Sequence, residues 1–131
     1  MEEKSVMDAL VQMKRTGNLL NELLDLTQQL GQAIDRNDQV SIQMLVAMRE
    51  EPLAKLQAAD QALRDQLESI ADPQSAAQLA SMLNGGQPAQ EEDQTQQGLC
   101  SQVAANQRRL KQVMDLDRVL NQRMALGRSA Y

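Results

Sequence analysis

Apolar residues recur along most of this chain at alternating steps of three and four positions, which is the spacing of one face of an α-helix. The first such run extends from about Glu3 to Arg36. A second apolar row, which includes Leu19, Leu23 and Leu26, lies beside the first. Two adjacent rows form a wide stripe, so we expect this helix to contact two neighbours. The first row contains Val6, Leu10, Met13, Gly17, Leu20, Leu24, Thr27, Gly31 and Ile34.

A polar segment, Asp35-Arg36-Asn37-Asp38, interrupts the pattern. Asn and Asp favour turns, and Asp38 suits the N-cap of a second helix, which we predict from about 39 to 71. So short a connection makes the two helices antiparallel. Pro52 lacks the N–H that would bind the carbonyl of Met48, so the sequence predicts a kink or a break in this helix.

Asp72-Pro73 is typical of a helix start, and it predicts a short helix over 73–84 that ends at Gly85-Gly86. The polar segment of about 85–94 has almost nothing to bury and predicts a mobile loop. The last helix is predicted over about 95–125. We therefore expect one all-α domain over 1–131, an elongated antiparallel bundle of three long helices plus one short helix. The seam of the last helix contains Leu99, Val103, Asn106, Leu110, Val113, Asp117, Leu120 and Met124.

The composition argues against several classes of function. The chain has no His, Trp or Phe, and its formal net charge is −5. An acidic chain without stacking aromatics is not expected to bind nucleic acid, and no apolar stretch is long enough for membrane insertion. Without histidine or a phosphate-binding loop, we expect no enzyme activity, catalytic residue, metal or cofactor. No secretory signal is recognisable, and the single Cys100 fits a reducing, cytoplasmic location.

Charge and polarity vary along the last helix. Between Ala105 and Arg128 lie six basic and two acidic residues, in a chain that is otherwise acidic. These cations would either complement acidic neighbours within the bundle or meet an acidic partner. Asn106 and Asp117 occupy seam positions, where a polar side chain either fixes the register or marks a loosely packed helix.

The order of these elements resembles the FlgN-type flagellar export chaperones of the type III export system. The resemblance rests on the Leu-rich first helix and on the turn Ile34-Asp35-Arg36-Asn37-Asp38. It also rests on two segments of the last helix, Val103-Ala104-Ala105-Asn106-Gln107-Arg108-Arg109-Leu110 and Leu120-Asn121-Gln122-Arg123. It covers nearly the whole chain, through degenerate helical patterns.

The resemblance implies a cytoplasmic chaperone that binds helical ends of hook–filament junction proteins and prevents their premature assembly. It places the binding stretch at about Leu99 to Met124. The alternative is an oligomeric coiled-coil structural or adaptor protein with no export role. The expected partner-binding residues are Leu99, Val103, Arg108, Leu110, Val113, Met114, Arg118, Leu120, Arg123 and Met124.

Overall fold

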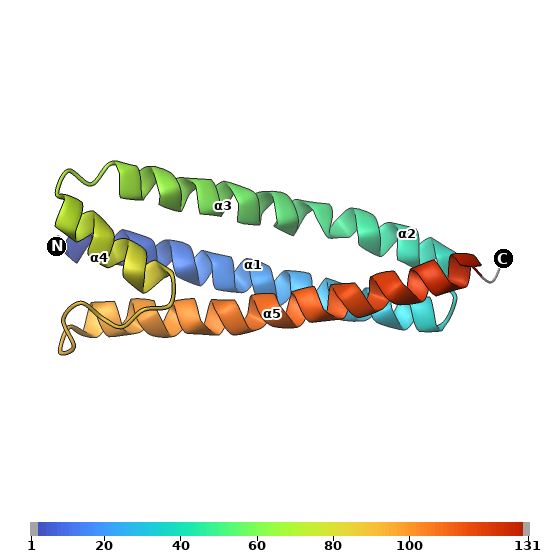
Figure 1. Cartoon of the computed structure of the whole chain (residues 1–131). Helices are drawn as coiled ribbons and strands as arrows, with labels where there is room; N and C mark the ends of the chain where they lie inside the picture. The colour runs from blue at the N-terminus through green and yellow to red at the C-terminus, as the bar shows by residue number, and fades with distance from the viewer. Residues whose placement is uncertain (1–2, 130–131) are drawn as a thin grey trace.

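Five helices make up the fold in the computed structural model, which describes residues 3–129 and the side chains of residues 3–125. No strand occurs within the described range. The predicted all-α bundle of long helices plus one short helix is therefore confirmed, with the second long segment divided in two (Figure 1). The helices are α1 (Glu3–Asp35), α2 (Gln39–Met48), α3 (Glu50–Glu68), α4 (Pro73–Leu83) and α5 (Gln94–Ser129).

The turn between α1 and α2 is built by two polar residues. Asn37 adopts a positive φ of 54°, a conformation that Asn tolerates better than most residues, and this ends α1. The N–H of Asp38 then reaches back to the carbonyl of Ala33 at 3.0 Å. The Asp38 carboxylate accepts the backbone N–H of Ser41 at 3.1 Å and so caps α2. The chain thereby reverses direction, and α2 and α3 return along α1.

The break between α2 and α3 comes from Pro52. A helical N–H at position 52 would bind the carbonyl four residues earlier, which belongs to Met48. Proline cannot make this bond, and α2 ends at Met48. Arg49 keeps helix-like angles, with φ −71° and ψ −18°, and α3 begins at Glu50. The two helices therefore continue in nearly the same direction, with Arg49 between them.

The short helix α4 has a defined end at each side. At its start, the carboxylate of Asp72 accepts the backbone N–H of Gln74 at 3.3 Å and the hydroxyl of Ser75 at 2.7 Å. At its end, Gly85 adopts a φ of 97°, and the N–H of Gly86 binds the carbonyl of Ser81 at 2.9 Å. This is a Schellman-type ending, which needs a residue that tolerates positive φ.

The linker from Asn84 to Asp93 leads back to the start of α5. Asp93 caps α5, because its carboxylate accepts the N–H of Thr95 at 2.9 Å and that of Gln96 at 3.1 Å. The side chain of Gln96 is buried and accepts the N–H of Gln90 at 2.8 Å. The linker is thus tied to the first turn of α5, and the mobility expected for 85–94 stays a prediction.

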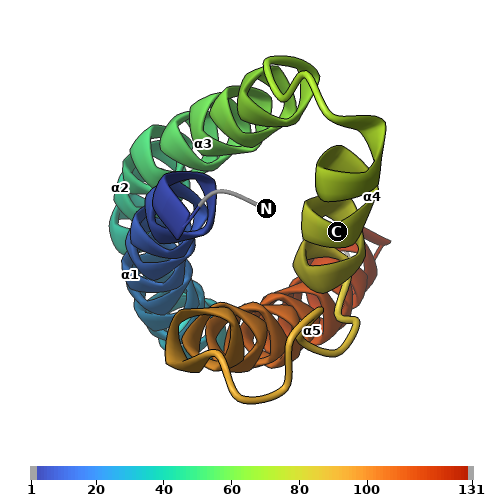
Figure 2. The ribbon, with the colours of Figure 1, turned by 90° about the vertical axis from the view of Figure 1, so that its left-hand side faces the viewer.

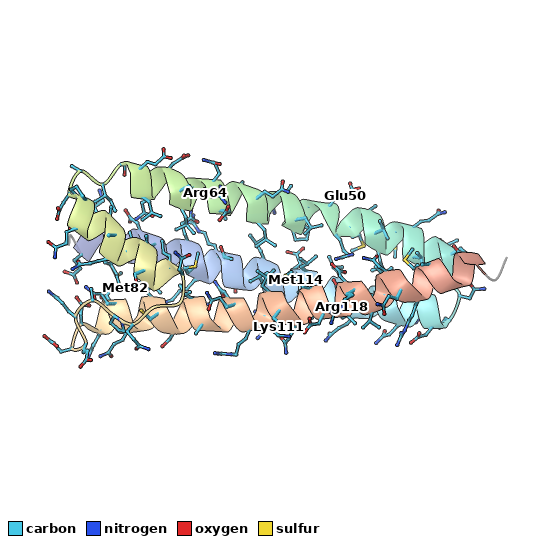
Figure 3. The ribbon with its side chains drawn as sticks, viewed as in Figure 1. Glu50, Arg64, Met82, Lys111, Met114 and Arg118 are labelled. Atoms are coloured by element: carbon cyan, nitrogen blue, oxygen red, sulfur yellow. The ribbon has the colours of Figure 1, made fainter. Side chains whose placement is uncertain are left out.

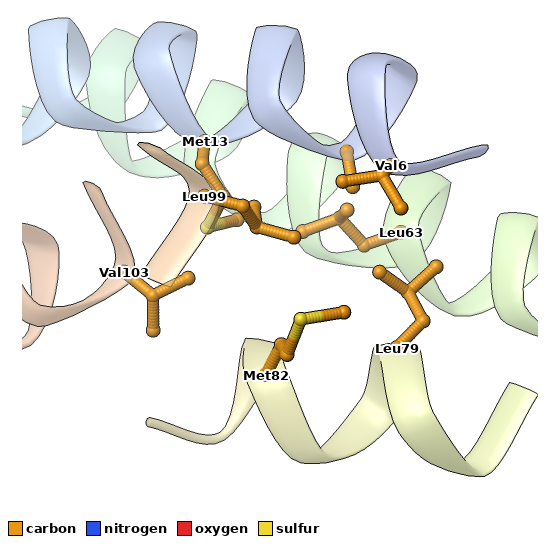
Figure 4. Packing of buried hydrophobic residues seen from close by; sticks show 8 residues of the cluster. Val6, Met13, Leu63, Leu79, Met82, Leu99 and Val103 are labelled. Carbon is orange, nitrogen blue, oxygen red and sulfur yellow. The ribbon is translucent and has the colours of Figure 1, made fainter. Parts of the chain in front are cut away.

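Most of the core forms two clusters at the two ends of the bundle, and Leu20, Leu23 and Val113 are buried outside both. Viewed along the bundle axis, α4 lies opposite α1 and between α3 and α5 (Figure 2). Met82 of α4 belongs to the end that holds the N-terminus (Figure 3). The cluster at that end combines residues of four helices (Figure 4): Val6, Ala9, Met13, Leu63, Leu79, Met82, Leu99 and Val103. The cluster at the far end has no residue of α4: Leu26, Leu30, Ala33, Leu45 and Leu120.

Candidate partner-binding surface

One row of residues on α5, repeated every seven positions, faces α1. Leu99, Asn106, Val113 and Leu120 are all buried, none more than 7% exposed. The amide of Asn106 donates to the backbone carbonyl of Met13 at 2.8 Å. Leu120 packs against Gly31 of α1. Because α1 and α5 run in the same direction, this row stays on α1 along the length of the bundle.

A second row of α5, also repeated every seven positions, changes its environment along the helix. It consists of Val103, Leu110, Asp117 and Met124. Val103 is 2% exposed and packs in the cluster with Leu79 and Met82 of α4, whereas Leu110 is 45% exposed. Val103 and Leu110, seven residues apart, lie on the same side of α5, but the first is buried and the second is exposed.

The length of α4 explains this difference. α4 ends at Leu83, and Gly85 then lies against the side chain of Gln107 on α5. Gln107 is about one helical turn before Leu110, so α4 covers α5 only up to this level. Met114, one turn beyond Leu110, is 61% exposed. The bundle therefore has a fourth helix at one end and none at the other.

The opposite wall of the uncovered part comes from α2 and α3. Val46 and Leu53 are 43% and 42% exposed. They lie three and four residues from Arg49, and helical spacing places them on the same side of α2 and α3 as Arg49. A guanidinium nitrogen of Arg49 donates to both carboxylate oxygens of Asp117 at 2.7 Å, so this side faces α5. We call Val46, Leu53, Leu110 and Met114 the open face.

The ion pair that crosses the open face is partly buried. The side chain of Arg49 is 15% exposed and that of Asp117 is 34% exposed. The Nε atom of Arg49 is buried and has no hydrogen-bond partner among the described residues. A shallow depression on α5 begins at Met114, includes Asp117 of this pair and continues past Arg118 and Asn121. The uncovered surface of α5 thus continues beyond the Arg49–Asp117 pair toward its C-terminal end.

The structure divides the ten expected partner-binding residues into two groups. Leu99, Val103, Val113 and Leu120 are no more than 3% exposed and belong to the core. They are apolar seam residues that pack on α1 or α4, and a partner cannot reach them in this conformation. Six others remain accessible, five of them exposed and Met124 half-buried: Arg108, Leu110, Met114, Arg118, Arg123 and Met124.

Both explanations of the basic last helix find support in the ion pairs. Arg123 pairs with Asp35 of α1 at 3.0 Å, as expected for charge complementarity inside the bundle. Lys111 pairs within α5 with Asp115 at 2.7 Å, and its hydrogen bond holds the pKa of that carboxyl below its usual value. Arg108 and Arg109 form no ion pair among the described side chains. Arg128 lies outside these side chains.

Asn106 and Asp117, the two polar seam residues, both have structural partners. Asn106 reaches the Met13 carbonyl across the small Gly17, which leaves room for the amide. Asp117 binds Arg49. Sequence reasoning proposed register fixing for both residues but did not find Arg49. Two features of the sequence could have indicated this pair. Arg49 lies next to the break that Pro52 causes, and Asp117 is a carboxylate on the apolar seam of α5.

The described part of the chain shows no candidate metal site and one half-buried cysteine. Within the described residues, no group of three His, Cys, Asp or Glu side chains could hold a metal ion. Cys100 is half-buried, and this burial raises the pKa of its thiol, which disfavours the reactive thiolate. Among residues 3–129, no helix is apolar enough over a sufficient length to cross a membrane.

Comparison with known proteins identifies no relative, since no family model, curated protein or solved structure matches this chain.

Proposed function

We propose that this chain is a cytoplasmic flagellar type III export chaperone, without catalytic activity, that binds helical ends of hook–filament junction proteins. The observation that carries this proposal is the contrast between Val103 and Leu110. The same row of α5 is covered where α4 is present and exposed where α4 is absent. An amphipathic client helix that lies in line with α4 would cover the exposed part.

The open face sets the size of the client segment. From Leu110 to Met124 the helix rises by about 21 Å, which is the length of a helix of about 14 residues. Such a helix would pack its apolar stripe on Leu110 and Met114 from one side and on Val46 and Leu53 from the other. Its apolar face would then be shielded from premature assembly with other subunits.

Charge supports a preference for acidic clients. Arg118 is exposed one turn beyond Met114 on the same side of α5, and Arg108 is exposed on a different side of the helix. Arg118 lies 3.6 Å from Asp115, a contact too long and too exposed to neutralise it fully. These cations would speed association with a client helix that carries Asp or Glu beside its apolar stripe.

The test measures binding between the whole chain and a purified hook–filament junction protein by calorimetry. The double variant Leu110→Asp/Met114→Asp places two charges on the open face. We expect it to weaken binding by about 1–3 kcal/mol per anchor lost, because a client would have to desolvate them. Both side chains are exposed, so thermal unfolding should change little.

The matched control is Val40→Asp/Met44→Asp on α2. These residues have the same spacing, and they are 78% and 54% exposed. The control should bind the client as the unchanged chain does. No complex between the unchanged chain and the junction protein at micromolar concentrations would refute the chaperone proposal. Equal loss in both variants would refute the open face as its site.

A second candidate, the structural or adaptor oligomer, is favoured by the outer surface of α2. Val40, Met44 and Met48 form an exposed apolar row, and the helix contains no charged residue. A row without charges can pair with its own copy without repulsion. Light scattering of the unchanged chain and of Val40→Asp/Met44→Asp tests this. A dimer that the substitutions dissociate would support the oligomer, and a monomer at all concentrations would exclude it.

A further inference from the structure

On the other side of the α1-facing row of α5 lies a small polar hollow of about 360 Å³. Its lining residues repeat at the spacing i, i+3, i+4, i+7 on each of the two parallel helices, so each helix contributes two turns of one face. We call this hollow the polar notch. It is lined by Lys14, Gly17, Asn18 and Asn21 of α1 and by Gln102, Ala105, Asn106 and Arg109 of α5.

The notch exists because its floor is made of small residues. Gly17 has no side chain, and Ala105 contributes one methyl group. Gln102 and Asn106 are held to one another, since the Gln102 amide donates to the Asn106 carbonyl oxygen at 2.9 Å. Asn18 and Asn21 are exposed at the rim and offer further amide N–H groups. The lining is therefore rich in hydrogen-bond donors and has no acidic residue.

Two cations flank the notch without acidic partners. Lys14 and Arg109 form no ion pair with any side chain of residues 3–125. The carboxylate of Asp25 continues this face of α1 one turn beyond Asn21 and accepts a hydrogen bond from Gln29 at 2.9 Å. Two other carboxylates of α1 act elsewhere. Asp8 lines a different hollow together with Gln66, and the charge of Glu22 acts on Lys55. Lys14 and Arg109 are thus left without a direct ion pair among the described side chains.

The spacing of Lys14 and Arg109 indicates what kind of anion the notch would bind. Lys14 is at the first turn of the notch on α1 and Arg109 at the last turn on α5. The parallel register, in which Gly17 meets Gln102 and Asn106, separates them by about one and a half to two turns, or roughly 10 Å along the axis. A single small anion would contact both cations only if the two long side chains bent toward each other. Two carboxylates on one chain can contact both without such bending.

We propose that the polar notch binds an acidic segment of a protein partner, with two carboxylates about 10 Å apart that pair with Lys14 and Arg109. On a partner helix this distance corresponds to acidic residues seven positions apart. Amide groups of Asn18 and Asn21 would donate to the same carboxylates. Met7 and Val11, exposed by 43% and 44%, continue the row of Lys14 on α1 and would contact apolar residues of the segment.

The test titrates the isotope-labelled whole chain with a synthetic Ala-rich helical peptide that carries two glutamates seven residues apart. Backbone amide signals of residues that line the notch should shift and saturate, and a peptide with glutamines at the two positions should leave them unchanged. Lys14→Gln/Arg109→Gln should weaken peptide binding by about 2- to 30-fold, the combined effect of two exposed ion pairs. Added salt should weaken it further.

The control variant Lys55→Gln/Lys111→Gln removes the same charge from two lysines that already have partners, Glu51 and Asp115. It should bind the peptide as the unchanged chain does. Equal weakening in both variants would overturn the proposal, because the effect would then come from net charge alone. Absence of shifts in the notch would overturn it as well. The proposal would also be overturned if inorganic phosphate shifted the same signals at a lower concentration than the peptide.

Discussion

Replacement of Gly17 by alanine tests whether Asn106 anchors α5 to α1. A Cβ atom at position 17 would lie 2.8 Å from the Nε2 atom of Gln102 and 2.9 Å from the Oδ1 atom of Asn106. Both distances are too short for unperturbed side chains. Gln102 can rotate away at its flexible end. Asn106 cannot move without stretching its 2.8 Å hydrogen bond to the carbonyl of Met13.

The expected free-energy change combines two opposing effects. Alanine is favoured over glycine in a helix interior by about 1 kcal/mol. Loss of the buried bond between Asn106 and Met13 costs about 1–3 kcal/mol, because the carbonyl and the amide would then lack partners away from water. Gly17→Ala should therefore range from neutral to about 2 kcal/mol destabilising.

Gly98→Ala provides the matched comparison within α5. A Cβ atom there would have Leu10 as its nearest neighbour at 3.8 Å, which is ordinary contact. The alanine should therefore stabilise the chain by about 0.5–1 kcal/mol. Thermal unfolding followed by circular dichroism at 222 nm should place Gly98→Ala at least about 2 °C above Gly17→Ala. If Gly17→Ala unfolds at the same temperature as Gly98→Ala or higher, the anchoring role of Asn106 is refuted.

Three other predictions concern the ion pair, the linker and the helix caps. Arg49→Met should destabilise the bundle by about 1–3 kcal/mol, as measured by urea unfolding, because it leaves Asp117 without its partner. The double variant Arg49→Met/Asp117→Leu should recover most of this loss. A double variant as unstable as the single one would contradict a partner role for Asp117. Limited proteolysis should cut first between Gly85 and Asp93, where no helix protects the backbone, and a first cut within α1 would contradict this. Hydrogen bonds from Ser41 and Ser75 lower the pKa values of Asp38 and Asp72 below 3.8, so the unfolded chain binds more protons and stability should fall as the pH drops from about 5 to 3. Asp38→Asn/Asp72→Asn should flatten this part of the pH profile, and an unchanged slope would exclude the two caps as its cause.

The helix ends could be predicted from the sequence because local chemistry determines them. Asp38 and Asp72 cap α2 and α4 with their own side chains, and Gly85 ends α4 through its positive φ. These interactions span at most five residues, so no knowledge of distant contacts is needed. The proline effect is equally local, although its consequence appears at Arg49, three residues before Pro52. The acceptor that Pro52 leaves without a donor is four residues earlier, on Met48.

The candidate surface could not be predicted because it depends on where α4 lies. In the sequence, Val103, Leu110 and Asp117 occupy equivalent positions, and the periodicity of α5 continues through all three. Burial of Val103, exposure of Leu110 and the pairing of Asp117 follow from the length of α4 and from the position of Arg49. Neither is encoded within α5. The ten residues expected to bind a partner were therefore a mixture of core and surface.

The two proposed surfaces flank the row by which α5 packs on α1, with the open face on one side and the polar notch on the other. One α5 helix therefore has three roles at different angles around its axis. Substitutions in the central row, such as Val113→Ala, should act on both surfaces at once, because they loosen the contact that positions α5. Substitutions at Leu110 or at Arg109 should act on one surface each, even though the two residues are adjacent in sequence. Separate loss of helix binding and of acidic-peptide binding in these two variants would therefore distinguish two sites from a general loosening of α5.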